Sequence, residues 1–238
     1  MRKLIIKTFE DFDNLNVDEM VKETLKKNKK KFIITVNPEI FIQAVENSSI
    51  NEMLLSKNTI NIPDSIAVER AIKKTCKKTI SRYPGVDLLT KIIEEGDKLS
   101  KTIYLYGSKE EVNASMKEWI EIKYPNLKVI GRKNGYDFEE SLVQKEIIKL
   151  NPDIVAVALG MPKQEQFLYN LQNKLTKGIL IGVGGAFAAI TGKVKRAPKI
   201  MIKLKLEWLY RLIREPKRIG RFFKYNIKFV LFKIEKEK

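Results

Sequence analysis

The chain lacks histidine altogether and contains a single cysteine, and these two shortages exclude several kinds of chemistry. Without an imidazole there is no Ser-His-Asp triad, no Cys-His pair and no zinc site with histidine ligands. The lone thiol of Cys76 cannot form an intramolecular disulfide or a multi-cysteine metal cluster, which is typical of a protein in a reducing compartment. Acid–base catalysis is therefore left to carboxylates, amines or phenols.

Long hydrophobic runs are also missing. No uninterrupted apolar stretch approaches the roughly 18 to 20 residues that a membrane-spanning helix needs. The N-terminal sequence MRKLIIKTFEDFDN turns acidic too early for a secretory signal. We therefore expect a cytoplasmic protein. Its 238 residues, 44% of them hydrophobic, are enough for one large domain, or for a domain with an appendage.

Positive charge is concentrated at the C-terminal end. Residues 193–238 hold 16 of the 46 basic residues and four acidic ones, so they carry 12 of the formal net charge of +17. The same segment contains seven of the 21 aromatic residues. A segment that is both basic and aromatic suits an anionic membrane surface or a nucleic acid. We predict a core over residues 1–192 and a basic, amphipathic helical appendage over residues 193–238.

Short runs rich in Ile and Val alternate with amphipathic stretches, a pattern that predicts βα units around a mainly parallel sheet. We expect strands at Lys31–Thr35, Thr59–Ile62, Thr102–Tyr106, Leu127–Ile130, Asp153–Leu159 and Gly178–Val183. Helical periodicity is clearest at Val17–Asn28, Glu39–Asn47, Val86–Leu99, Glu110–Lys123, Glu139–Leu150 and Lys163–Lys174, and Ser65–Lys78 also reads as helical. The fold class is therefore α/β, with a Rossmann-like sheet flanked by helices.

Ligands of such sheets bind beyond the carboxyl ends of the strands, so the residues there are candidate site residues. Asp64 directly follows the second strand, where its carboxylate either faces the crevice or caps the next helix. Gly184 and Gly185 form a turn that either binds phosphate at a helix N-terminus or is a tight turn without a ligand. No G-x-G-x-x-G occurs in the first βα unit and no P-loop motif occurs anywhere, which disfavours dinucleotide and P-loop proteins.

Three polar residues remain ambiguous on spacing alone. Thr35 and Asn37 either bind a ligand or simply end a strand, and Gln164 opens a helix after a Gly-Met-Pro turn. The default interpretation of Gln164 is a polar side chain exposed to solvent. Contact with a ligand is the alternative.

Together, these elements form an ordered series of motifs that resembles a known family, the WecG/TagA/CpsF family of bacterial glycosyltransferases. The resemblance runs from roughly Thr35 to Arg221. It is carried by Thr35-x-Asn37-Pro38-Glu39, Pro63-Asp64, Arg82-x-Pro84-Gly85-x-Asp87, Leu159-Gly160-x-Pro162-Lys163-Gln164-Glu165, Gly182-Val183-Gly184-Gly185-x-Phe187, Gly192-Lys193-Val194-Lys195-Arg196-Ala197-Pro198 and Leu206-Glu207-Trp208-Leu209-Tyr210-Arg211-Leu212.

The resemblance implies an inverting, UDP-sugar-dependent hexosyltransferase. The expected reaction moves N-acetylmannosamine or a related hexose to an undecaprenyl-diphosphate-linked GlcNAc-type acceptor, in the synthesis of a teichoic acid, capsule or exopolysaccharide. No cofactor and no metal are expected. The appendage is expected to dock the enzyme on the inner face of the cell membrane, and the oligomeric state is left open.

The resemblance also assigns roles to individual residues. Asp64 becomes the catalytic base, with Thr35 and Gln164 as further catalytic residues. Positive charge for the leaving diphosphate is expected from Arg211, Arg218 and Arg221. Substrate binding is expected from Asn37, Arg82, Tyr136, Gly184 and Gly185.

Two positions depart from the family pattern: Ser65 stands where glycine is usual after Pro-Asp, and Ala188 stands where an acidic residue is usual. Residues 1–30 match poorly and receive no role. The alternative function is a basic nucleic-acid-binding protein with a Rossmann-like core, for which the appendage alone would be the evidence.

Overall fold

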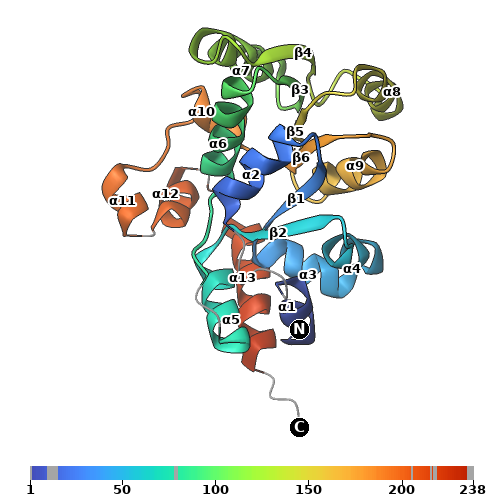
Figure 1. The fold of residues 1–238 in the computed structure, drawn as a ribbon. Coiled ribbons are helices and arrows are strands. Elements are labelled where there is room, and N and C mark those ends of the chain that lie inside the picture. Colours follow the sequence, from blue (N-terminus) through green and yellow to red (C-terminus); the bar gives the residue numbers. More distant parts are fainter. Residues whose placement is uncertain are drawn as a thin grey trace.

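The computed structural model describes residues 2–9, 16–77, 80–204, 206–214, 216 and 219–234 (Figure 1). Its six strands are β1 (Lys30–Val36), β2 (Thr59–Pro63), β3 (Thr102–Gly107), β4 (Lys128–Lys133), β5 (Ile154–Ala158) and β6 (Gly178–Gly182). All pair in parallel, in the order β2-β1-β6-β5-β3-β4. The predicted α/β class with a parallel sheet is confirmed.

The helices of the core connect these strands and cover both faces of the sheet. They are α1 (Arg2–Thr8), α2 (Val17–Lys26), α3 (Pro38–Glu46), α4 (Ser48–Leu55), α5 (Ile66–Cys76), α6 (Gly85–Lys98), α7 (Glu110–Lys123), α8 (Glu140–Leu150), α9 (Lys163–Gln172) and α10 (Ala186–Ile190). One buried cluster joins α1, α3, α4, α8 and α9 to the sheet, and a second joins α2, α6, α7 and α10 to its other face (Figure 1).

The faces follow from the handedness of the crossovers. The connections from β1 to β2, β4 to β5 and β5 to β6 all run toward the β2 edge, and their helices α3, α4, α8 and α9 share one face. The connections from β2 to β3 and β3 to β4 run the opposite way, and α6 and α7 lie on the other face. Helix α5, which precedes α6 in the β2–β3 connection, packs instead in the first cluster. This is the arrangement that right-handed crossovers produce. The strands β5 and β6 are buried along their whole length because helices cover both of their faces.

The C-terminal segment forms α11 (Lys199–Lys203), α12 (Glu207–Arg214) and α13 (Ile219–Ile234). Helix α13 packs against α3, and Phe229, 2% exposed, lies 5.8 Å from Phe41 between ring centroids. Helix α12 meets α13 where the rings of Trp208 and Phe222 stack at 5.3 Å. The last helix thus contributes to the main core, while the boundary we predict at Lys193 stays a prediction.

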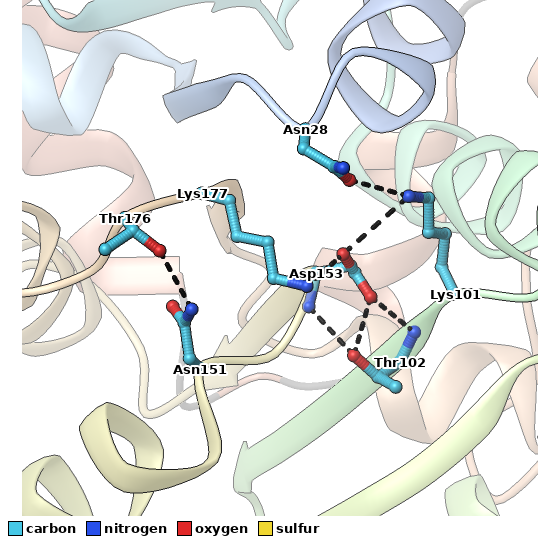
Figure 2. Close-up of polar contacts among 7 residues, drawn as sticks. All are labelled: Asn28, Lys101, Thr102, Asn151, Asp153, Thr176 and Lys177. Carbon is cyan, nitrogen blue, oxygen red and sulfur yellow. Dashed lines mark hydrogen bonds and ion pairs between the residues drawn. The ribbon is translucent and has the colours of Figure 1, made fainter.

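The amino ends of three central strands are held together by one carboxylate, that of Asp153 (Figure 2). The Asp153 Oδ2 atom accepts two hydrogen bonds from Thr102, one from its backbone N–H at 3.0 Å and one from its side-chain hydroxyl at 2.7 Å. Its Oδ1 accepts from Lys177 Nζ at 2.7 Å, and Lys101 Nζ lies at 3.9 Å. Burial alone would raise the pKa of Asp153, but the hydrogen bonds from Lys177 and Thr102 outweigh it and hold the pKa below its ordinary value.

Candidate active site

The carboxyl ends of the strands form the opposite edge of the sheet, and most of the expected site residues lie there. Moving along the strand order, this edge presents Asp64 after β2, Asn37 after β1, Gly184 after β6 and Gly160 after β5. Four neighbouring strands therefore bring their following loops together, as expected for the ligand-binding edge of an open α/β sheet.

Asp64 does not cap the helix that follows it, so that alternative is wrong. Ser65 is the N-cap of α5, and its Oγ accepts from the N–H of Val68 at 3.2 Å. The Asp64 carboxylate instead accepts from the N–H of Gly85, the first residue of α6, at 3.0 Å. The backbone of Asp64 still follows the sheet, because its N–H donates to Val36 O. The positive end of the α6 dipole therefore stabilises this carboxylate in its ionised form.

Thr35 lies beside the same helix terminus. It pairs with Ile62 in the register of β1 and β2, and it is 8% exposed. A Cβ atom added to Gly85 would lie 3.7 Å from Thr35 Cγ2, so the threonine side chain faces the turn that donates to Asp64. Thr35, Asp64 and Gly85 thus form one compact group.

Asn37 and Arg82 flank this group, and the structure gives each a structural contact. The side-chain oxygen of Asn37 caps α3 by accepting from the N–H of Ile40 at 3.1 Å. Arg82 precedes α6, and its backbone N–H donates to Glu69 Oε2 at 3.2 Å. These contacts fix the backbone at both positions and leave their substrate-binding roles as predictions.

Gln164 is a buried bridge between two loops, so the default interpretation as a solvent-exposed side chain is wrong. It is 3% exposed, and its Oε1 accepts from the N–H of Gly184 at 2.9 Å and of Gly160 at 3.2 Å. The amide packs on Gly182, where an added Cβ atom would lie only 2.7 Å from Nε2, so a larger residue is excluded there. Gln164 therefore sets the spacing between the loops that follow β5 and β6.

The turn at Gly184 and Gly185 bears on the two alternatives left open for it, a phosphate site or a tight turn without a ligand. Gly184 has a φ of +49°, which glycine adopts readily. Its N–H is already bound by Gln164, and the helix that follows, α10, has only five residues. A helix this short provides little dipole for an anion, which favours the interpretation as a tight turn. Substrate binding at Gly184 and Gly185 stays a prediction. Gly185 is exposed at the N-cap of α10.

Glu165 also lies near this edge, although no role was predicted for it. It is 1% exposed, its Oε1 accepts from Gln164 Nε2 at 2.7 Å, and its Oε2 is buried without a hydrogen-bond partner among the described residues. Burial raises the pKa of Glu165 to about 7, the hydrogen bond from Gln164 opposes this rise, and the charge of Glu39 adds to it. The motif placed Glu165 in the first turn of a helix, but nothing in its spacing indicated burial.

Of the three arginines expected at the site, the structure places the side chain of one. Arg221, in the first turns of α13, donates from Nε to Glu39 Oε1 at 2.7 Å and from Nη2 to the carbonyl of Met161 at 2.9 Å. It therefore reaches the loops after β1 and β5 from the appendage. Arg211 lies on α12, and Arg218 lies outside the described residues.

A second arginine of the C-terminal segment, Arg196, fastens it to the core. Its Nη1 and Nη2 lie 2.7 and 2.8 Å from the two carboxylate oxygens of Asp87. Asp87 is in the first turn of α6, the same turn whose Gly85 binds Asp64. Two motifs far apart in the sequence thus meet beside the predicted base.

Tyr136 lies apart from these residues. It follows β4, whereas Asp64 follows β2, and these are the two edge strands, whose ends lie roughly 24 Å apart at the usual strand spacing. Asn134 Oδ1 accepts from the Tyr136 N–H at 2.9 Å, and the side chain is 74% exposed. The structure does not bring Tyr136 to Asp64, so contact with a shared ligand requires one that extends along the strand ends.

The described residues contain neither a group of metal-binding side chains nor a membrane-spanning helix. Among the described residues, no group of three or more Cys, Asp or Glu side chains is placed to hold a metal ion. Within the same ranges, every helix is too short or too polar to cross a bilayer.

The chain is similar to a known protein family and to several named proteins. The model of the glycosyl transferase WecG/TagA/CpsF family matches residues 6–238, which extends the resemblance beyond both ends of the expected range. A protein of Bacillus subtilis is 38% identical over 93% of this chain and 86% of its own length. A protein of Bacillus spizizenii is 36% identical over 82% of this chain and 75% of its own length, and one of Staphylococcus aureus is 31% identical over 96% and 91%.

All three relatives carry the name N-acetylglucosaminyldiphosphoundecaprenol N-acetyl-beta-D-mannosaminyltransferase. The chain therefore belongs to the WecG/TagA/CpsF family of glycosyltransferases.

Proposed function

We propose that this glycosyltransferase moves N-acetylmannosamine from a UDP-sugar to undecaprenyl-diphosphate-linked GlcNAc, in the synthesis of a cell-surface polymer such as a teichoic acid. The names of the relatives support this donor sugar and acceptor. The family match favours it over the nucleic-acid-binding alternative. The observation that carries the chemistry is the position of Asp64, at the carboxyl end of β2, beside Thr35 and held by the first N–H of α6.

In the proposed reaction, the Asp64 carboxylate removes the proton from the acceptor hydroxyl. The acceptor oxygen then forms a bond to the anomeric carbon while the bond from that carbon to the diphosphate oxygen breaks on the opposite face. The sugar inverts its configuration, UDP leaves with the bonding electron pair, and Asp64 retains the proton. A positioned base of this kind contributes about 10²- to 10⁴-fold.

Charge on the departing diphosphate is met by arginine in this proposal, without a metal ion or a cofactor. Arg221 is the best-placed candidate because it already reaches the loops after β1 and β5. Its present partner is the Glu39 carboxylate, an anion that the diphosphate would replace. Guanidinium groups bind such oxygens through paired hydrogen bonds, which suits this exchange. Arg211 and Arg218 stay predictions in the same role.

Membrane docking is proposed for the outer surface of the appendage, which would place the enzyme on the inner face of the cell membrane. Several large apolar side chains there are at least 40% exposed: Ile200, Leu204, Trp208, Ile213, Phe223 and Ile227. Lysines and arginines between them would meet anionic headgroups at about 1 kcal/mol each. I213S and F223S should weaken binding to vesicles containing phosphatidylglycerol, whereas I122S, at an 80% exposed site on α7, should not. If I213S and F223S bound these vesicles as strongly as I122S, docking through the appendage would be contradicted.

The reaction itself is tested with the full-length protein, UDP-N-acetylmannosamine and a lipid-diphosphate-GlcNAc analogue. A panel of other UDP-sugars establishes donor preference, and the anomeric configuration of the product tests inversion. Absence of transfer from every UDP-sugar would refute the proposed function. Transfer that persists in both D64A and D64N would remove Asp64 from the mechanism and leave the substrate assignment standing.

A further inference from the structure

Glu165 is a buried carboxyl group that binds Gln164, the residue that bridges two loops of the candidate site. Only one of its oxygens has a described hydrogen-bond partner, Gln164 Nε2, and the other is buried without one. Buried polar atoms without a partner cost free energy and are rare in folded proteins. Underpartnered acids of this kind concentrate at functional sites.

The orientation of the Gln164 amide depends on this carboxyl group. Gln164 Oε1 accepts from the N–H groups of Gly160 and Gly184, which is possible in only one of the two orientations of the amide. In the reversed orientation, the NH₂ group would face both donors. Glu165 Oε1 accepts from Nε2 and so selects the orientation that holds the two loops.

We propose that Glu165 is a positioning residue of the transfer reaction: it fixes the Gln164 amide, and through it the loops at Gly160 and Gly184, more firmly when ionised than when protonated. Hydrogen bonds to an ionised acceptor are roughly twice as strong as those to a neutral one. The kinetic part of this inference rests on the proposed function. The effect on the two loops does not.

The surroundings of Glu165 make its titration observable. Burial raises its pKa to about 7, and Glu39 on α3, which binds Arg221 of α13, adds to the rise. The chain has no histidine that would titrate in the same range. Strands β5 and β6 carry no charged side chain. The other charged groups on α9 and on elements packed against it are Lys163 on α9, Lys30 and Lys31 at the amino end of β1, Glu52 on α4, and Glu140, Lys145, Glu146 and Lys149 on α8.

The first test measures kcat and KM for the UDP-sugar from pH 5.5 to 8.5. The wild-type kcat/KM should rise about threefold or more between pH 6 and 8, whereas E165Q, which keeps an acceptor oxygen but does not titrate, should be nearly flat. E165L, which removes the acceptor, should lose about tenfold at every pH, mostly through KM. A pH profile of E165Q that matches the wild type would overturn the inference.

Gln172 supplies a matched control on the same helix. It lies two turns beyond Glu165, is 2% exposed and also has a buried oxygen, Oε1, without a described partner. Q172L therefore disturbs the α9 core without touching Gln164. Q172L should keep the wild-type pH profile of kcat/KM. If Q172L lost as much kcat/KM as E165L, and E165Q did not restore the activity that E165L loses, Glu165 would be only a packing residue.

The second test does not depend on transfer activity. At pH 8, hydrogen exchange at the amides of Gly160 and Gly184 should be about tenfold faster in E165L than in wild type or Q172L. Exchange in E165Q should be intermediate, because its neutral amide holds Gln164 less firmly than the ionised carboxylate does. Absence of transfer in the wild type would refute the proposed function and leave this measurement intact. Unchanged exchange in E165L would refute the inference, even in an active enzyme.

Discussion

The two ends of the parallel sheet use buried carboxyl groups in opposite ways. At the amino ends, Asp153 receives hydrogen bonds from Lys177 and from both the backbone and the hydroxyl of Thr102, so its charge is compensated from all sides (Figure 2). At the carboxyl ends, Glu165 has one described hydrogen-bond partner and one buried oxygen without any. The pKa of Asp153 is lowered, and that of Glu165 is raised to about 7. The fold thus has a well-partnered acid, Asp153, at the amino ends of the strands and an acid with one unpartnered oxygen, Glu165, near the edge where ligands are expected.

The largest expected effect separates activity from stability. D64N should lower kcat by about 10²- to 10⁴-fold because an amide cannot take the acceptor proton. Its melting temperature should change little, since the amide oxygen can still accept from Gly85. Steady-state kinetics and thermal denaturation of the same preparation measure both. A large loss of stability would instead make Asp64 a structural residue like Asp153.

The reverse behaviour is expected of Asp153. D153N should lower the free energy of unfolding by about 3 kcal/mol at pH 7 because it removes the charge that pairs with Lys177 and Lys101. The pKa of Asp153 is lowered, so its stabilisation is present above the ordinary pKa of an aspartate and is lost as the pH falls through the folded-state value. Urea denaturation at several pH values tests this, and a penalty that persists in acid would contradict the electrostatic account.

Glu165 should show the opposite pH dependence. Its raised pKa means that the protonated form stabilises the fold fully below the ordinary pKa of 4.5, and that this contribution is lost as the pH rises through about 7. Relative to E165Q, the wild-type free energy of unfolding should therefore fall by about 2 to 3 kcal/mol between pH 5 and pH 8. A constant difference between the two proteins across this range would place the titration elsewhere.

The smallest effect concerns the pair that joins the appendage to α6. The Arg196 and Asp87 side chains are 31% and 43% exposed, so solvent screens their attraction. A double-mutant cycle with R196Q and D87N should give a coupling free energy of about 0.5 to 1 kcal/mol, which falls as salt is added. Coupling that does not respond to salt would indicate that packing holds the two residues together.

The sequence predicted the central strands well because their residues are apolar on both faces. The expected Lys31–Thr35 became Lys30–Val36, for example. The edge strand β4 was expected at Leu127–Ile130 but runs from Lys128 to Lys133, because Arg132 and Lys133 have no apolar signature on an exposed edge. Helices α1 and α4 were missed since each is only seven or eight residues long.

The sequence predicted only those site residues whose position follows directly from the end of a strand. The position of Asp64 followed from the end of its strand, but its bond to Gly85 depends on how α6 packs against the sheet. The burial of Glu165 and the bridge made by Gln164 likewise arise where α9 meets β5 and β6, which no local pattern reports. The meeting of Arg196 with Asp87 joins residues that are 109 positions apart.

That last contact has a mechanical consequence. The first turn of α6 holds the predicted base through Gly85 and the C-terminal segment through Asp87, so both are attached to the same three residues. Under the membrane docking proposed above, a displacement of the C-terminal segment would act on this turn as well as on α3, against which α13 packs. The proposed anchorage and the proposed proton transfer would therefore depend on one and the same helix turn.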